Sequence, residues 1–114
     1  MDRTRLPREL RPFVDEDGRL NRWPSRYKVQ RMAATLLAGR FERGREYSEA
    51  EVNLLLIEAH TFGDWAIIRR SLVDWRYLDR ESDGSRYRLR PDAPTDFEPV
   101  VVGISSSGSR SPRP

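Results

Sequence analysis

Arginines recur in the second half of the chain at spacings that suit phosphate binding. Arg69 and Arg70 are adjacent, Arg80 follows, and Arg86 and Arg88 occupy alternate positions after an Asp-Gly pair. A guanidinium group carries a permanent charge and binds phosphate oxygens through paired hydrogen bonds, so these residues favour contact with a nucleic-acid backbone. We therefore select Arg69, Arg70, Arg80, Arg86 and Arg88 as candidate DNA-binding residues.

The sequence contains no pattern that indicates catalysis or metal binding. Cysteine is absent, which excludes a thiolate nucleophile and a cysteine-ligated metal, and His60 is the only histidine. A lone histidine at the predicted end of a helix is typical of a capping or surface residue, because a metal site needs further ligands. No Gly-rich phosphate loop follows a predicted strand. We expect no enzyme activity, no cofactor and no metal site.

The length of 114 residues suits one small domain, and the formal net charge of +3 is too small to identify a nucleic-acid binder. The charges are unevenly distributed: residues 19–45 and 65–90 are mainly basic, whereas residues 46–64 are acidic. Such blocks either neutralise one another in the fold or face different partners. No apolar run approaches the roughly 20 residues that span a bilayer, and no signal peptide is evident, so we expect a cytoplasmic protein without a membrane partner.

A helix that begins after Asp64 must position the first two arginines. Trp65, Ile68, Leu72 and Trp75 recur at a spacing that places them on one stripe of a helix. The opposite face carries Ala66, Ile67, Arg70, Val73 and Asp74. This face has one cation and no Asn, Gln or Lys, the residues that usually accompany Arg in reading base edges.

Beyond Leu78 the pattern changes to a period of two. Tyr87 and Leu89 lie on one face of a predicted strand, and the arginines between them lie on the other face. The Asp83-Gly84 pair before this strand is typical of a hairpin turn. The sequence thus predicts a helix followed by a two-stranded ribbon.

Two further helices are predicted before this unit. The first runs from about Ser25 to Gly39 and is followed by a short strand that ends at Tyr47. The second begins at a capping box formed by Ser48 and Glu51 and ends near His60. Helix, strand, helix, helix and ribbon in this order predict an α+β winged helix: a three-helix helix-turn-helix core with a short strand and a C-terminal β-hairpin wing.

We assign residues 13–90 to this domain. Residues 1–12 are basic and proline-containing and predict a disordered arm, either a plain terminus or an arm that contacts phosphates. Residues 91–114 predict a Pro/Ser-rich, mostly disordered tail, in which the apolar run Val100–Ile104 either docks on the domain as an edge strand or remains free.

The stretch from Phe13 to Leu89 resembles the bacterial family catalogued as domain of unknown function 2087. The resemblance rests on several motifs in the right order: Phe13 with Asp17-Gly18-Arg19, Pro24, Phe41-Glu42-Arg43-Gly44-Arg45, Tyr47-Ser48-Glu49 with Glu51-Val52-Asn53, Arg69-Arg70 with Leu72-Val73-Asp74, and Leu78-Asp79-Arg80 with Asp83-Gly84-Ser85 and Tyr87. It implies a winged-helix-like fold. Some members of the family are joined to helix-turn-helix regulator domains, which hints at transcriptional control.

One residue departs from the family pattern. Arg76 stands where the family usually has a glycine that ends the third helix. A residue other than glycine in a left-handed helix cap costs about 1 kcal/mol. The sequence therefore leaves open whether the helix ends in the same way, ends differently or extends.

We hypothesise a small DNA-binding protein that acts in transcription regulation. In this hypothesis, Arg70, Arg80, Arg86 and Arg88 hold phosphates of double-stranded DNA. The alternative is a protein-interaction winged helix without direct DNA binding, in which Ala66, Ile67 and Val73 form an apolar patch that contacts a protein partner or a second copy of the chain.

Overall fold

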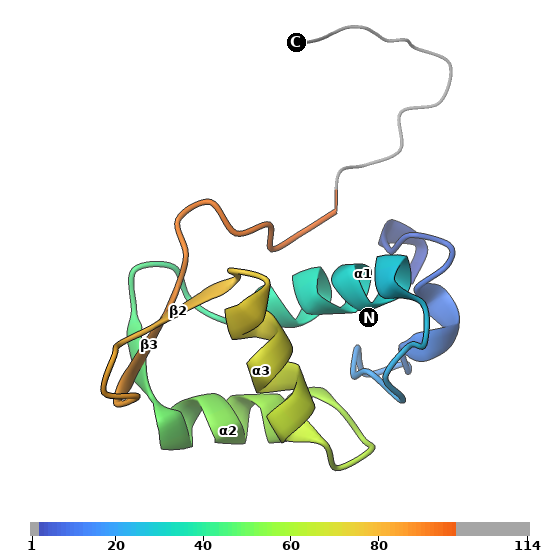
Figure 1. The fold of residues 1–114 in the computed structure, drawn as a ribbon. Helices are drawn as coiled ribbons and strands as arrows, with labels where there is room; N and C mark the ends of the chain where they lie inside the picture. The colour runs from blue at the N-terminus through green and yellow to red at the C-terminus, as the bar shows by residue number, and fades with distance from the viewer. Residues whose placement is uncertain (1–2, 98–114) are drawn as a thin grey trace, which may run out of the picture.

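The computed structural model describes residues 3–97 and has an α+β fold with three helices and one small antiparallel sheet (Figure 1). In chain order the elements are two single turns of 3-10 helix (Arg3–Arg5 and Arg11–Phe13), α1 (Tyr27–Ala38), β1 (Glu46–Ser48), α2 (Glu49–Ala59), α3 (Trp65–Asp74), β2 (Leu78–Arg80) and β3 (Arg86–Leu89). The three predicted helices, the short first strand and the C-terminal hairpin are all present at the expected places.

The helices pack around a single apolar core. Each helix turns small or branched apolar side chains inward at helical spacing, and the fully buried ones include Val29 and Leu37 of α1, Val52 and Leu56 of α2 and Leu72 of α3. The two tryptophans at the ends of the predicted α3 stripe are only partly buried. The aliphatic residues of the stripe therefore lie inside the core, and the two tryptophans at the ends of the stripe lie at the edge of the core.

The capping box at the start of α2 forms as predicted. The backbone N–H of Glu51 donates to Ser48 Oγ at 3.1 Å, and the backbone N–H of Ser48 donates to Glu51 Oε1 at 2.8 Å. The bond from the Ser48 amide is the main reason that the pKa of Glu51 lies below its ordinary value. At the start of α3, the Asp64 carboxylate accepts from the backbone N–H of Ile67.

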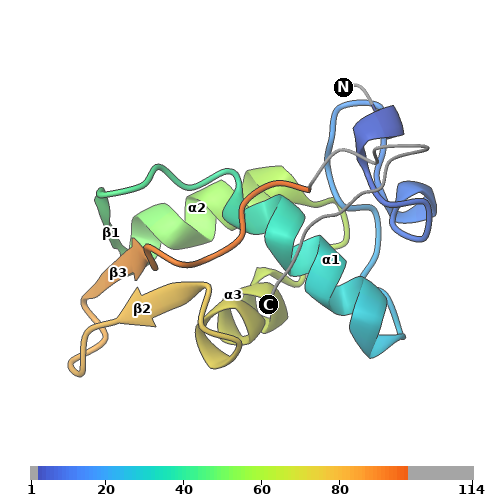
Figure 2. The same cartoon turned by 90° about the horizontal axis from the view of Figure 1, so that it is seen from above.

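The sheet has the strand order β1-β3-β2, with both pairs antiparallel (Figures 1 and 2). Leu78 lies opposite Leu89, and Arg80 lies opposite Tyr87. Opposed residues share a face, so these four side chains point toward the helices. The intervening positions point outward, and the register Glu46 to Arg88 places an acid and a base side by side there.

Helix α3 ends at Asp74, and the turn that follows it passes through Arg76, the position for which the family resemblance implies a glycine. Arg76 has a φ of 63°, in the left-handed region, although it is not a glycine. The backbone N–H groups of Arg76 and Tyr77 donate to the carbonyls of Val73 and Leu72 at 3.1 and 2.8 Å, which is the paired bonding of a Schellman motif. The ending is therefore retained with an arginine in the strained position.

The prediction of a disordered arm over residues 1–12 differs from the structure for the residues that it describes. Leu6 and Leu10 are 4% and 0% exposed and belong to the core. The Arg11 guanidinium donates to the carbonyl oxygens of Thr4 and Leu6, and Lys28 of α1 lies 3.2 Å from Glu9. Two leucines in a polar segment were too few to predict burial from the sequence. In the structure both pack into the apolar core beside α1.

Residues 91–97, which the sequence assigned to a disordered tail, also pack on the domain. The Arg43 guanidinium donates to the carbonyl oxygens of Arg90, Pro91 and Ala93 at 2.7 to 3.2 Å. Ala93 is buried, and the segment crosses the end of α1 near Gly39 (orange in Figure 2). The apolar run Val100–Ile104 lies outside the described residues.

Within residues 3–97, no helix has the length and apolar character needed to cross a bilayer.

Candidate nucleic-acid interface

A groove of about 370 Å³ lies between α3 and the β2-β3 hairpin. It is lined by Ala66, Arg69, Arg70, Val73, Asp74, Arg80 and Tyr87. Three of the lining residues are arginines and one is an acid, so the groove is basic. It brings together three of the five arginines that the sequence selected and two of the three residues of the alternative apolar patch.

The residues from α3 reach the groove because they share one face of the helix. Ala66, the adjacent Arg69 and Arg70, and Val73 are three or four residues apart, one turn after another, and this face lies away from the buried Ile68 and Leu72. Ile67, the third residue of the apolar patch, is 37% exposed and does not line the groove.

Arg80 reaches the groove because of the strand register. It is the residue opposite Tyr87, so it lies on the helix-facing side of the hairpin, beyond the buried pair of Leu78 and Leu89. Arg80 is exposed, and it forms no ion pair with any residue between 3 and 97. Its positive charge is therefore available to a ligand.

The two arginines of α3 differ in how many contacts their side chains make within the protein. Arg69 Nη1 donates to Asn53 Oδ1 at 2.7 Å and lies 3.7 Å from Glu49 Oε1, and the guanidinium also stacks over the Trp65 ring. Arg70 is 83% exposed and has only a 4.0 Å contact with Asp74, one turn further along α3. Arg69 is therefore held in the groove by three side chains, whereas Arg70 presents an exposed charge.

Tyr87 lines the groove and connects it to Glu49 of α2. The buried Tyr87 hydroxyl donates to Glu49 Oε1 at 3.1 Å, and burial raises the pKa of this phenol above its ordinary value. The sequence analysis selected neither these two residues nor Asn53. A usable signal existed for Asn53, because it is an amide that interrupts the apolar run of α2.

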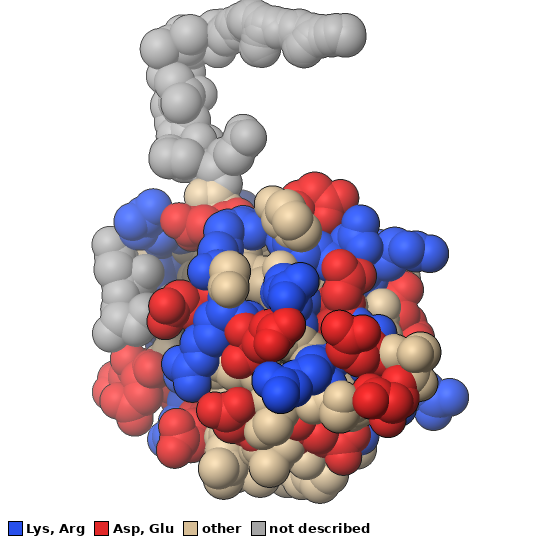
Figure 3. Space-filling model, turned by 90° about the vertical axis from the view of Figure 1, so that its left-hand side faces the viewer, with Lys and Arg blue, Asp and Glu red and all other residues tan. Residues whose placement is uncertain are grey.

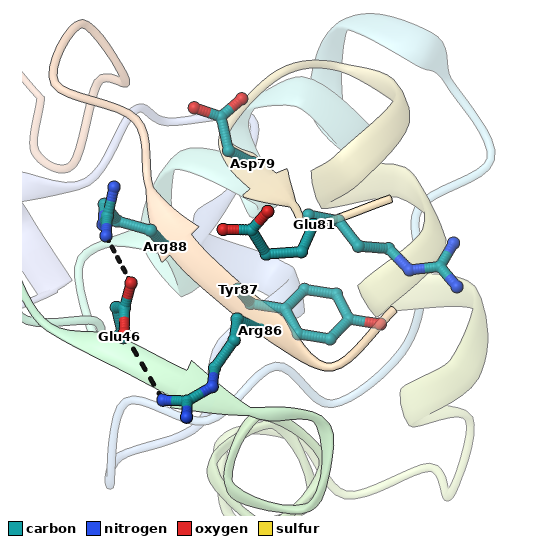
Figure 4. A pocket seen from close by; sticks show the side chains of 7 residues that line it. Glu46, Asp79, Glu81, Arg86, Tyr87 and Arg88 are labelled. Carbon is teal, nitrogen blue, oxygen red and sulfur yellow. Dashed lines mark hydrogen bonds and ion pairs between the residues drawn. The ribbon is translucent and has the colours of Figure 1, made fainter. Parts of the chain in front are cut away.

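The other two predicted arginines lie on the opposite side of the sheet. Arg86 Nη1 and Arg88 Nη2 are 3.4 and 2.5 Å from the two carboxylate oxygens of Glu46, so a single acid bridges both (Figure 4). Conversely, the single guanidinium of Arg90 pairs with two acids, Asp79 and Asp92. Arg86 and Arg88 therefore do not line the groove that holds Arg69, Arg70 and Arg80, although Arg80 also lines a hollow with them.

Basic and acidic side chains alternate over this side of the molecule, without a broad area of either sign (Figure 3). The hollow on the outer sheet face is lined by Glu46, Asp79 and Glu81 together with Arg80, Arg86, Tyr87 and Arg88. Three acids offset its three arginines, so this hollow has no excess charge with which to attract a phosphate.

His60 has a structural position at the junction of α2 and α3. It is 5% exposed; its Nδ1 lies 2.5 Å from the Leu56 carbonyl oxygen, and the backbone N–H of Asp64 donates to its Nε2 at 3.0 Å. The ring therefore carries its proton on Nδ1 and caps both helices, as expected for a lone histidine at a helix end. In the described part of the chain, no group of three or more potential ligand side chains could hold a metal ion.

These features define a small α+β protein with a basic groove between its third helix and its C-terminal hairpin. Residues 19–89 match a bacterial protein family described as "uncharacterized protein conserved in bacteria" (DUF2087), and this match covers more than half of the chain. The protein belongs to the DUF2087 family. Neither a curated protein nor a solved structure matches the chain.

Proposed function

We propose that the domain is a winged helix that binds double-stranded DNA through the groove between α3 and the β2-β3 hairpin, in the control of transcription. The observation that carries the proposal is the convergence of Arg69, Arg70 and Arg80 on this groove. Arginines on separate elements that meet at one concave surface suit contact with successive phosphates of a backbone.

The order and pairing of the elements support the winged-helix part of the proposal. A helix, an edge strand, two helices and a hairpin follow one another, and the first strand pairs with the last in the order β1-β3-β2. In DNA-binding proteins of the helix-turn-helix class, the second helix of the motif enters the major groove. Here that helix is α3, and the hairpin beside it is the wing.

The chemistry of the groove favours contact with phosphates over reading of bases. Arg70 is the only residue with hydrogen-bond donors in its side chain among the exposed positions 66, 67, 70 and 74 of α3. Ala66 and Ile67 beside it can contact only apolar parts of a base such as the thymine methyl group. We therefore expect weak sequence preference and strong dependence on salt, with Arg70 the residue closest to the base edges.

Arg86 and Arg88 have a secondary role in this proposal. A phosphate that approached either residue would compete with Glu46 for the same guanidinium. The net gain from exchanging one anion for another at an exposed site is small. Arg80, which forms no ion pair with an acid in the described part of the chain, is the main phosphate ligand of the wing.

Binding of labelled duplex DNA, measured by fluorescence anisotropy at several salt concentrations, tests the proposal. We expect the logarithm of the binding constant to fall linearly with the logarithm of the salt concentration. Replacing Arg70 and Arg80 by alanine should lower the magnitude of this slope by about 2, because each lost phosphate contact accounts for about 0.9. Arg86→Ala and Arg88→Ala are the matched controls from the outer sheet face and should change the slope little.

A second candidate function is supported by the apolar residues beside the arginines. Ala66 and Val73 line the groove, and Ile67 is exposed next to them. A protein partner with an apolar segment and acidic flanks would complement this surface. Failure to bind duplex DNA at low salt, together with a protein partner that is lost on Ile67→Glu, would favour this function over the first.

A further inference from the structure

The outward face of α2 is apolar although it faces solvent. Leu54 and Ile57 are 61% and 46% exposed, and the buried residues of the same helix, Val52, Leu56 and Ala59, lie on its other side. In Figure 3 uncharged side chains gather at the lower end of the molecule, the level at which Figure 1 places α2. Two large exposed aliphatic side chains one turn apart on a short helix form a contact patch.

A groove of about 360 Å³ runs beside this patch. It is lined by Arg40, Glu42, Arg45, Tyr47, Glu51, Leu54, Leu55 and Glu58. It belongs to a different part of the surface from the groove between α3 and the hairpin, because the two share no lining residue. The proposed DNA contact therefore leaves it uncovered.

The charges along this face are divided between its two ends. At the N-terminal end of α2, the Arg45 guanidinium stacks on the Tyr47 ring at 4.7 Å from the centroid and lies 3.3 Å from Glu51. Two turns further along the same stripe, Glu58 forms no ion pair with any residue that the structure describes. One end thus presents a half-exposed guanidinium that pairs with Glu51 and has further N–H donors, and the other end presents an anion without an ion pair in residues 3–97.

We propose that this face is the interface of a symmetric dimer, in which α2 packs antiparallel against α2 of a second copy. A two-fold axis between Leu54 and Ile57 sets each Leu54 against the Ile57 of the other copy. At 1.5 Å of rise per residue, each Glu58 then lies within about 3 Å, along the helix axis, of the level of Glu51 in the other copy. The Arg45 guanidinium lies at that end, so it meets the Glu58 carboxylate, which forms no ion pair within residues 3–97.

The charge pattern selects this arrangement over the alternatives. A parallel pair of α2 helices would place each Glu58 next to its own counterpart, which is repulsive. The antiparallel pair joins opposite charges twice, because a two-fold interface repeats every contact. The apolar centre is small, so the dimer is weak and depends on protein concentration.

Sedimentation equilibrium over a range of protein concentrations tests the dimer. We expect a reversible monomer–dimer equilibrium for the full chain. Leu54→Glu should weaken association by more than about tenfold, because it places a charge in the apolar centre of the interface and each dimer contains two copies of the substitution. The matched control is Tyr27→Glu, a 59% exposed aromatic residue of α1 outside the interface, which should leave the equilibrium unchanged.

A charge reversal tests the orientation. Glu58→Arg alone should weaken the dimer, because the introduced charge meets Arg45 of the other copy. Combining it with Arg45→Glu should restore association, because opposite charges then meet again at both ends. A wild-type chain that stays monomeric up to about 1 mM, a range in which even weak specific dimers associate, overturns the proposal. So does a Leu54→Glu chain that associates as strongly as the wild type, or a double variant that associates no better than Glu58→Arg.

Discussion

The backbone N–H of Tyr77 donates to the carbonyl oxygen of Leu72 at 2.8 Å, and this bond closes the end of α3. It can form only if the residue before Tyr77 turns the chain through the left-handed region, and that residue is Arg76, with a φ of 63°. The bond sets the direction in which β2 leaves the helix. The position of Arg80 in the groove therefore depends on a strained residue four positions earlier.

Arg76→Gly should raise the free energy of unfolding by about 1 kcal/mol, because glycine adopts the left-handed conformation without a steric cost. Urea unfolding at neutral pH measures the change. Arg76→Ala should differ from the wild type by less than about 0.5 kcal/mol, because it removes the charge and keeps the strain. Arg70→Gly, in the interior of α3, should have the opposite effect and lower stability by about 1 kcal/mol. Equal effects of the two glycine variants would contradict the assignment of strain to Arg76.

His60→Phe should lower the free energy of unfolding by about 1 to 3 kcal/mol. A phenyl ring fills a similar space beside Phe62, whose ring centroid is 4.5 Å from that of His60, but it leaves the Leu56 carbonyl and the Asp64 amide without their side-chain partner. The neighbouring exposed residue provides the control, and Thr61→Ala should change stability by less than about 0.5 kcal/mol. A His60→Phe protein as stable as the wild type would show that neither helix depends on this cap.

Acid should destabilise the domain in part through Glu51. The Ser48 amide donates to this carboxylate, and the pKa of Glu51 in the folded protein is therefore lower than in the unfolded chain. A lowered pKa contributes stability above the unfolded value of about 4, and this contribution is lost as the pH falls through the folded value. Glu51→Gln keeps an acceptor for the Ser48 amide without a titrating group. Urea unfolding across this pH range should therefore show a shallower decline for the variant, and parallel declines would count against the argument.

Arg43→Ala should release the segment that follows β3. The Arg43 guanidinium binds three backbone carbonyls between Arg90 and Ala93 and also the Thr95 hydroxyl. Hydrogen exchange should show faster exchange of the Ala93 amide, which donates to the Arg90 carbonyl within this segment. Arg45→Ala, two residues away, is the control and should leave this exchange rate unchanged. Unchanged protection in the Arg43 variant would mean that burial of Ala93 alone holds the segment.

Local signals in the sequence were sufficient to predict the helices and the hairpin. The helical spacing of Ile68 and Leu72, the capping box at Ser48 and the alternation around Tyr87 each depend on residues within one or two turns of one another. The same signals predicted that Arg86 and Arg88 share a strand face. They did not predict that Glu46 lies between these arginines, because that contact requires β1 to pair with β3 across about forty residues.

The candidate site was predictable only in part for the same reason. The sequence places Arg70 on the face of the helix opposite its core stripe, with Arg69 next to it, whereas Arg80 joins them through a strand register that no local pattern specifies. Leu6 and Leu10 alone gave too little apolar periodicity to predict an ordered segment. The partners of Arg43 were not predictable either, because the chain brings residues 90–95 back to Arg43 only in the folded structure.

The sequence by itself determined which segments form helices and strands and which side of each is apolar, since these properties follow from backbone geometry and side-chain hydrophobicity over a few residues. Only the tertiary structure decided which arginines are neutralised and which remain available. Folding places Glu46 beside Arg86 and Arg88, whereas no acid between residues 3 and 97 forms an ion pair with Arg80. The availability of a charge depends on what folding places within a few ångströms of it, whatever the separation along the chain.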